Sequence, residues 1–298
     1  MTRFACLVGL VLFAAGLVSA DDTYTLKLER GSKKGDKFVV AGAATQIQSQ
    51  KVTQGGVAAP EQKSYASMTF EGEVEILEVG ADGYATKATC TVHQCALSTE
   101  EGVEAKEAVA EGTVLTQTIV DGKKTVTSDK GELAAEVQAL LDEFLPCDTK
   151  DPGGDADACF GTAEPKKVGD VWPIHSDIVA QGLGEKMGSK IDPANVKGDA
   201  KLAEVVEHEG MQCTALHMEM QVLGIVPPGF PEAAEVKKSE MNIAMDVALP
   251  VDASMRQVAE RMEMTWEMAA TVQDPNGGKV EMEISVHNSK EVESMPVK

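Results

Sequence analysis

The chain has 298 residues, a net charge of −21 and an aromatic content of only 4%. So acidic a chain repels nucleic acids and anionic lipid surfaces, which argues against both as binding partners. Its length suffices for one large domain or two similar halves, in which aliphatic and methionine side chains must fill most of the core.

The first 20 residues have the pattern of a secretory signal peptide. Arg3 precedes an apolar run from Phe4 to Val18, and small residues end at Ala20. We predict cleavage after Ala20 and an exported protein, periplasmic or extracellular. The apolar run is short for a membrane span, and no later stretch is long and apolar enough to predict one. Loss of Arg3 would change the net charge to −22.

Two short motifs repeat along the chain, Lys33-Lys-Gly-Asp-Lys-Phe38 and Lys167-Val-Gly-Asp-Val-Trp172. Gly-Asp favours a tight turn, because Gly tolerates positive φ and Asp accepts hydrogen bonds from nearby backbone. The aromatic residue that follows is expected to enter a strand and anchor a core. We therefore interpret six residues as structural repeat anchors: Gly35, Asp36, Phe38, Gly169, Asp170 and Trp172.

Alternating apolar and polar residues predict antiparallel strands in the first half. They cover Thr23–Arg30, then a hairpin that turns at Gly80-Ala-Asp-Gly83, then a second hairpin around Asp121-Gly122. Apolar residues next follow helical spacing until Pro146, and the sequence predicts an amphipathic helix over 133–145 that covers a sheet. The residues of its stripe are Leu133, Val137, Leu140, Leu141 and Phe144.

The second half repeats this pattern after a short predicted helix at Ser176–Lys186. Residues 198–205 match residues 72–79 at an offset of 126, and the return strand follows at 127, which indicates one inserted residue in the turn. Further alternating runs, rich in methionine, follow to the end of the chain. The predicted fold is mainly β (α+β), with two similar halves forming a curved sheet or half-barrel; a two-layer sandwich is the alternative.

These patterns divide the chain into four segments. A signal peptide (1–20) precedes a first β-rich half (21–150) that carries the helix (132–145). An acidic, cysteine-bracketed loop (151–165) then leads to a second β-rich half (166–298).

Five cysteines remain once Cys6 is removed with the signal peptide. Cys147 and Cys159 bracket the acidic loop and are the predicted disulfide, worth roughly 2–3 kcal/mol. Cys90 and Cys95 cannot easily bridge within one extended strand, although either could reach Cys213. The pairing of these three cysteines stays open, and the odd number leaves at least one thiol unpaired or paired between chains.

Two clusters of residues suggest cation binding, but each also has a simpler explanation as part of the protein's structure. Asp148, Asp151, Asp155 and Asp157 place carboxylates around Gly153-Gly154, as Ca²⁺ requires, but their spacing does not match an EF-hand, and a solvated loop explains them. The methionine-rich strands offer thioethers for Cu⁺, but even spacing is also what a core face needs. The methionines are Met218, Met220, Met241, Met245, Met262 and Met264.

Catalytic motifs are not found in the sequence, which contains no G-x-S-x-G, H-E-x-x-H, P-loop or G-x-G-x-x-G pattern. Cys90, His93 and Cys95 would converge on a metal only through a β-bulge, because side chains alternate along a strand. We expect no enzyme, no cofactor and no catalytic residue.

The signal peptide, duplicated halves, K-x-G-D-x-[FW] turns and intervening helix resemble a family of exported bacterial β-rich proteins of unknown function. The resemblance implies a curved antiparallel sheet with few helices, similar to periplasmic lipoprotein-carrier folds. Our leading hypothesis is a non-enzymatic binding or structural protein that holds an apolar small molecule or lipid-like ligand between sheet and helix. The alternatives are a cation-binding protein, and a hydrolase with an unrecognised site.

Overall fold

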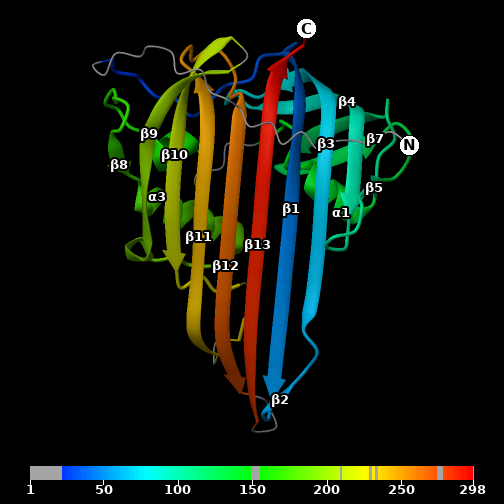
Figure 1. The fold of residues 1–298 in the computed structure, drawn as a ribbon, viewed down its shortest axis with the longest axis vertical. Coiled ribbons are helices and arrows are strands. Elements are labelled where there is room, and N and C mark those ends of the chain that lie inside the picture. The colour runs from blue at the N-terminus through cyan, green and yellow to red at the C-terminus, as the bar shows by residue number, and fades with distance from the viewer. Residues whose placement is uncertain are drawn as a thin grey trace.

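The described residues fold as one open antiparallel sheet of 13 strands with three short α-helices (Figure 1). This computed structural model describes residues 22–148, 155–208, 210–227, 230–231, 234–273 and 278–297. The predicted signal peptide and its cleavage site after Ala20 therefore lie outside the described residues. The mainly β fold class is confirmed.

The strands and helices have the following bounds in chain order. The first-half strands are β1 (Lys37–Gln54), β2 (Val57–Ala58), β3 (Gln62–Val79), β4 (Ala85–Ser98), β5 (Lys106–Glu107), β6 (Val114–Val120) and β7 (Lys123–Ser128). The helices are α1 (Ala135–Leu141), α2 (Ala156–Phe160) and α3 (Ser176–Met187), with a 3₁₀ turn at Pro193–Asn195. The remaining strands are β8 (Val171–Pro173), β9 (Val196–His208), β10 (Met211–Leu223), β11 (Glu235–Pro250), β12 (Ala259–Gln273) and β13 (Lys279–Pro296).

The first and last long strands of the chain meet in the middle of the sheet. The strand order is β7-β6-β4-β3-β1-β13-β12-β11-β10-β9-β8, with β2 and β5 attached to β1 and β4. β1 and β13 pair continuously from Phe38 opposite Pro296 to Gln54 opposite Val280. Figure 1 shows these central strands running the full length of the molecule. The two sequence halves therefore share one sheet.

The first Gly-Asp motif forms a tight turn that docks on strand β3. The Lys33 backbone N–H donates to Asp36 Oδ2 at 2.8 Å, and the Gly35 N–H donates to the Ile76 carbonyl at 2.8 Å. Gly35 has a φ of +87°, which explains the need for glycine. Phe38 follows in β1 and is buried in the core.

The second Gly-Asp motif makes the equivalent contacts with strand β9. The Lys167 N–H donates to Asp170 Oδ2 at 2.8 Å, and the Gly169 N–H, at a φ of +94°, donates to the Leu202 carbonyl at 2.7 Å. Trp172 follows in β8 and is buried. The two motifs thus have matching local geometry, each ahead of a strand that pairs with the hairpin.

The hairpins that follow the two Gly-Asp turns match each other in strand pairing. The second hairpin has more inserted residues than the sequence offset predicted. Val74 pairs with Cys90 in the first hairpin, and Ala200 pairs with Met218 in the second. Positions in the return strand are therefore offset by 128 and not by 127, because β-bulges in both hairpins alter the register.

Helix α1 packs on one face of the sheet, as predicted for 133–145. It buries Val137, Leu140 and Leu141, and the Phe144 ring beyond it stacks on Phe70 with centroids 5.2 Å apart. The regular helix is shorter than predicted because tighter turns follow Leu141. We call the face that carries α1 the inner face and the opposite one the outer face.

Helix α3 covers the inner face near the other edge of the sheet. Val179 and Ala180 pack against Met220, Val222 and Met241, which are residues of β10 and β11. Both helices lie behind the sheet in Figure 1. Strands β12, β13 and β1 form the part of the sheet that lies between them.

The predicted strand at Thr23–Arg30 does not form. Only Tyr24 makes a backbone bridge, with Lys166, although Leu26 and Leu28 are buried as the alternation implied. The Leu28 N–H donates to Asp157 Oδ1 at 2.6 Å, so a side chain takes the place of a neighbouring strand.

Candidate ligand-binding face

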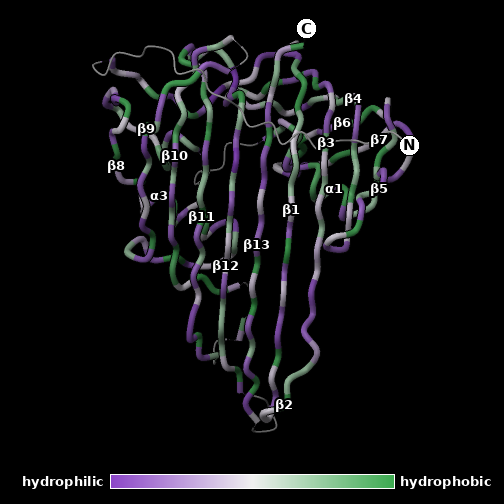
Figure 2. The backbone as a smooth tube through the Cα atoms, in the orientation of Figure 1, coloured by the Kyte–Doolittle hydropathy of each residue, from purple (hydrophilic) through white to green (hydrophobic). Residues whose placement is uncertain are grey.

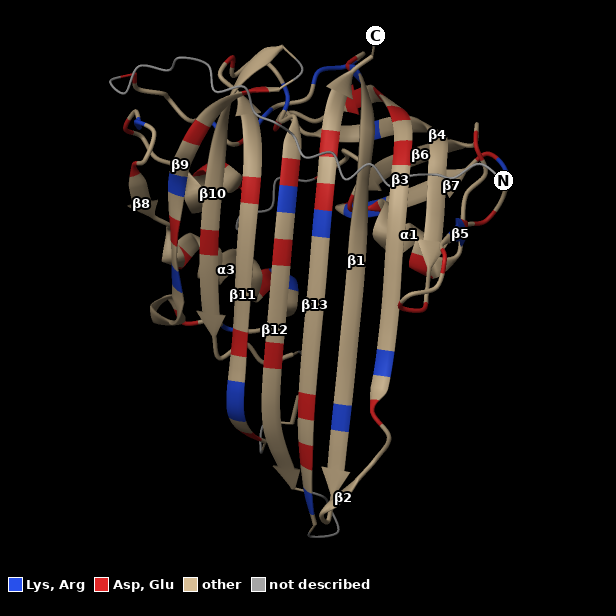
Figure 3. Cartoon of the chain, viewed as in Figure 1, with Lys and Arg blue, Asp and Glu red and all other residues tan. Residues whose placement is uncertain are grey.

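Over Met262–Met268 of β12 and Val280–Val286 of β13, the sheet has an apolar inner face and a charged outer face. The inner-face residues are Met262, Met264, Trp266 and Met268 of β12 and Val280, Met282, Ile284 and Val286 of β13. Residues between them, such as Glu263, Glu267 and Glu283, are exposed on the outer face. Figure 2 shows the alternating hydropathy, and Figure 3 shows the charges along these strands. Alternation of period two separates the faces.

The inner-face residues of β13 form an apolar strip, which we define as Val280, Met282, Ile284 and Val286. All four are only half-buried, and none belongs to the packed clusters of the core that the structure describes. Val52 of β1 and Ala270 of β12 flank Met282 across the ladder. A strip of this kind is available for contact with an apolar molecule.

Along β12 the apolar inner face continues beyond the strip. Met268, Trp266, Met264 and Met262 follow at every second position over roughly 20 Å of strand. Met262 pairs with Met245 of β11, so thioether side chains line neighbouring strands. Flexible methionine side chains adapt to ligands of different shape.

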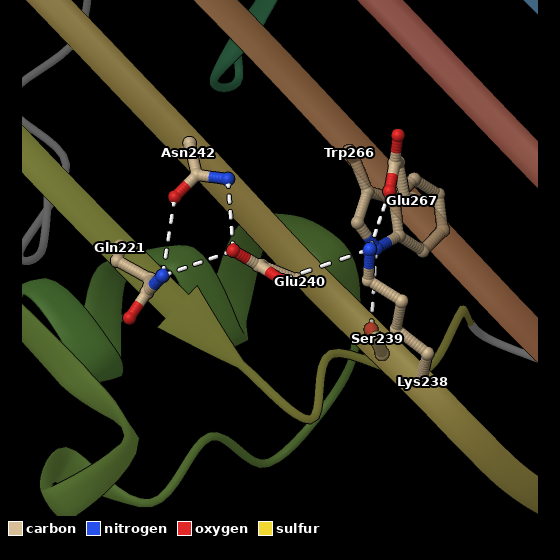
Figure 4. A network of polar contacts seen from close by, with 7 residues as sticks. All are labelled: Gln221, Lys238, Ser239, Glu240, Asn242, Trp266 and Glu267. Carbon is tan, nitrogen blue, oxygen red and sulfur yellow. Dashed lines mark hydrogen bonds and ion pairs between the residues drawn. The ribbon is translucent and has the colours of Figure 1, made fainter.

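Trp266 is fixed in this face by hydrogen bonds. Its indole Nε1–H donates to Ser239 Oγ at 3.2 Å (Figure 4). The Ser239 hydroxyl in turn donates to the Ile225 carbonyl. Ser239 is buried, so the network holds the segment after β10 against the inner face.

A polar ladder lies on the outer face of the same strands. Glu240 Oε1 accepts hydrogen bonds from Gln221 at 2.9 Å and from Asn242 at 3.2 Å. Lys238 forms an ion pair with Glu267 of β12 (Figure 4). Cross-strand polar pairs of this type keep the outer face hydrated while the inner face stays apolar.

A cavity of about 250 Å³ opens on the inner face, beyond the end of α1 and at the start of α2. Its sheet side is formed by Phe38, Val40 and Val292, and the chain beyond α1 contributes Phe144 and Leu145. We call this the central cavity. Because Ala259 and Glu260 at the start of β12 also line it, the cavity adjoins the methionine run of that strand.

Charged residues surround the apolar floor of the central cavity. Lys290 forms ion pairs with Glu260 at 3.2 Å and Glu143 at 3.9 Å. Glu29 Oε1 accepts a hydrogen bond from the Tyr84 hydroxyl at 2.7 Å. Burial raises the pKa of Glu29, against the opposing effect of that hydrogen bond. The cavity therefore combines apolar and ionic surfaces.

The predicted ligand space between sheet and helix is not found beneath α1. Val137, Leu140 and Leu141 pack directly on Met68, Phe70 and neighbouring core residues, and all of them are buried. The central cavity lies instead past the end of this helix, where the chain turns at Phe144 and Leu145.

The predicted disulfide is not supported by the structure. Cys147 packs in the cluster under α1, whereas Cys159 packs in the cluster beneath α3. The Cys147 thiol lies 3.7 Å from the carbonyl oxygen of Gln117, and the Cys147 N–H donates to the Gln117 side chain at 2.8 Å. Closeness in sequence was the basis of the prediction, but packing carries the two cysteines to separate clusters.

Cys90 and Cys95 lie on the same face of β4, contrary to the expected alternation. The register shifts between Glu71 and Gly72 of β3, which face Gln94 and Val92, so one residue of β4 is extra. This β-bulge returns Cys95 to the buried side, while His93 stays exposed and 3.5 Å from Glu71. The cysteines and His93 therefore point to opposite faces, and no S–S bond joins Cys90, Cys95 or Cys213.

The acidic residues of the predicted loop have separate partners. Asp148 forms an ion pair with Lys124 at 3.2 Å, Asp155 accepts from the N–H groups that begin α2, and Asp157 accepts from Leu28. Asp151 lies outside the described residues. Within the described part of the chain, no group of three or more His, Cys, Asp or Glu side chains is arranged to hold a metal ion.

The methionines proposed for Cu⁺ lie on the inner face. Met218, Met245 and Met262 form a row across β10, β11 and β12. His217 lies on the outer face, where it contacts Asp246 at 2.7 Å and Glu219 at 3.1 Å, so it cannot join these thioethers. Met218 is packed in the core with Leu202 and Leu216.

None of the helices in the described residues is long and apolar enough to cross a membrane.

Comparison with known proteins finds only distant structural likeness. No protein-family model and no curated protein matches the chain. A lipovitellin structure, described in terms of its lipid–protein interactions, aligns over 89% of this chain and 26% of its own, with 10% identity and a TM-score of 0.31. The chain thus spans about a quarter of the lipovitellin chain.

Two bacterial structures align at lower similarity. The outer membrane protein OprG from Pseudomonas aeruginosa aligns over 90% of this chain and 100% of its own, with 7% identity and a TM-score of 0.16. A LolA-superfamily protein from Nitrosomonas europaea aligns over 89% and 87%, with 7% identity and a TM-score of 0.11. At these scores the likenesses carry no functional argument, and the function must be inferred from the chain itself.

Proposed function

We propose that this chain is an exported, non-enzymatic binding protein that holds an apolar or lipid-like molecule on the inner face of its sheet. The observation that supports the proposal is the half-buried apolar strip of β13, together with the methionine run of β12 that leads to the central cavity. Contact with a ligand would remove this apolar surface from water, which is favourable by about 25 cal/mol per Å².

The proposal can be tested by titrating the lipid-stripped protein with a neutral, apolar fluorescent dye such as Nile red. Ile284→Asp places a charge in the apolar strip, and Ser285→Asp places the same charge one residue away on the outer face. Burying the added carboxylate against an apolar ligand is unfavourable, so Ile284→Asp should weaken dye binding about tenfold or more, whereas Ser285→Asp should leave it unchanged.

Thermal unfolding of both variants provides the control for folding. Equal dye affinity in the two variants, or no dye binding by the unsubstituted protein, would contradict the proposal. Native mass spectrometry of the protein as purified gives an independent readout, since a bound lipid-like molecule adds a discrete mass.

A further inference from the structure

Two arginines in the wall of the central cavity make no ion pair with a carboxylate among the described residues. Arg30 and Arg256 both line the cavity, yet neither guanidinium forms an ion pair in the described part of the chain. The chain contains 48 acidic residues against 27 basic ones, so carboxylates are plentiful. Lys290 in the same cavity is paired with two of them.

The hydrogen bonds of these arginines go to neutral oxygens. Arg30 donates from Nη2 to the Pro250 carbonyl at 2.9 Å and from Nη1 to the Asp252 carbonyl at 3.1 Å. Arg256 donates from Nη1 to Ser32 Oγ at 3.1 Å. The Nε atoms of both arginines are buried and make no hydrogen bond to the described residues. Each guanidinium has five N–H donors, so donor capacity remains.

Arg256 is held in a fixed position by an aromatic ring. Its Cζ atom lies 4.2 Å from the centroid of Phe38, the anchor of the first Gly-Asp turn. Burial lowers the pKa of both Arg256 and Arg30, and it outweighs the opposite effect of nearby carboxylates, Asp36 for Arg256 and Asp157 and Asp252 for Arg30. Neither guanidinium forms an ion pair with these carboxylates in the described part of the chain, so an anion in the cavity could accept the remaining N–H groups.

Apolar side chains form part of the cavity wall, beside the ionic group of Lys290, Glu143 and Glu260. The apolar residues are Leu28, Val40, Phe144, Leu145 and Val292. A volume of about 250 Å³ accommodates a head group and the beginning of a chain. From Glu260 at the cavity, the methionine run of β12 continues along the same inner face. The arginines of the cavity and the methionine run of β12 therefore follow one another along the inner face.

We propose that the central cavity binds the anionic head group of an amphiphile, a carboxylate or a phosphate, through Arg256 and Arg30, with its alkyl chain directed along β12. This inference rests on the proposed function, and it adds the chemical class of the ligand and the residues that select it. Arginine suits the role because its planar donors match carboxylate and phosphate oxygens.

The test compares ligands that share one alkyl chain and differ only in the head group. Dodecanoate, dodecyl phosphate and dodecanol are titrated, below their aggregation concentrations, against protein loaded with Nile red. We expect an anion to displace the dye at about tenfold lower concentration than the alcohol, as charge-assisted hydrogen bonds predict. A preference for dodecanoate indicates a fatty-acid type of head, and one for dodecyl phosphate a phospholipid type.

Variants assign this preference to the arginines. Arg256→Gln and Arg30→Gln should each reduce the anion preference severalfold while leaving dodecanol binding unchanged. Arg261→Gln, on the outer face of β12 where the guanidinium bonds Glu263 at 2.8 Å, is the matched control and should change neither. If Arg256→Gln fails to fold, Arg256→Lys keeps the charge without the planar donors and should retain only part of the preference.

The outcomes separate the two proposals. If dodecanol binds and the anions bind no better, or if the preference survives both arginine variants, the head-group assignment is overturned and the apolar-ligand proposal stands. If neither the alcohol nor the anions bind, both are overturned. Lower thermal stability of the arginine variants with an unchanged head-group preference would assign Arg256 and Arg30 a structural role only.

Discussion

Burial and neighbouring charge act differently on the ionisable side chains of the two faces. Burial raises the pKa of the thiols of Cys90 and Cys147 to about 12 and that of Cys95 to about 11. On the outer face, hydrogen bonds that the His217 ring donates to Asp246 and then to Glu219 raise the pKa of His217. Loss of water therefore sets the pKa of these buried thiols, whereas the carboxylate partners set the pKa of His217.

The His217 cluster predicts a stability that depends on pH. A folded-state pKa above the ordinary value of about 6.5 means that the stabilising contribution is complete below pH 6.5 and is lost as pH rises through the folded-state pKa. NMR titration should show a His217 pKa above 6.5, and Asp246→Asn should move it back toward 6.5. His217→Gln should flatten the decline of unfolding free energy with rising pH. A folded-state pKa at or below 6.5 would contradict this account.

The separate packing of the cysteines predicts insensitivity to reductant. Urea unfolding midpoints measured with and without a phosphine reductant should coincide, because Cys147 and Cys159 lie in different clusters. The originally predicted disulfide would instead have made the reduced protein less stable by roughly 2–3 kcal/mol. Mass spectrometry after alkylation in denaturant checks the same point.

Among the secondary-structure elements, the sequence predicted regular strands and helices better than bulges and turns. Alternation located the long strands, and helical spacing located α1, because both periods reflect which face is buried. The bulge that turns Cys95 inward and the turns after Leu141 depend on contacts with β3 and β6. Arg30 ends one alternating run and Arg256 lies far along the chain from it, so only tertiary packing brings them to one cavity.

Gly42 lies within strand β1 at a position where the structure leaves no room for a side chain. A Cβ atom on Gly42 would lie 2.2 Å from the Glu291 carbonyl oxygen of β13, and backbone there has little room to move. Gly42→Ala should therefore lower the free energy of unfolding by about 1–3 kcal/mol in urea denaturation. Ala43→Ser, at the exposed neighbouring position, should change it by about 0.5 kcal/mol or less. Equal stabilities would show that β1 and β13 separate readily.

For the whole molecule, the central position of β13 predicts the pattern of amide hydrogen exchange. β13 is hydrogen-bonded on both sides, by β1 and β12, whereas β7 and β8 each have one neighbouring strand in the described part of the chain. Exchange should be slowest in the middle of β1, β12 and β13 and faster in β7 and β8, measured by NMR or mass spectrometry. Rapid exchange in β13 would contradict a single cooperative sheet.

The seam between β1 and β13 also has a kinetic consequence. Residue 38 must find residue 296, so the central ladder closes only after nearly the whole described chain has been brought together. Contacts so distant in sequence form slowly, and until they form the long β1 edge offers its unpaired N–H and C=O groups to other molecules. The refolding yield should therefore fall as protein concentration rises, because one such nascent edge can capture another before its own distant partner arrives.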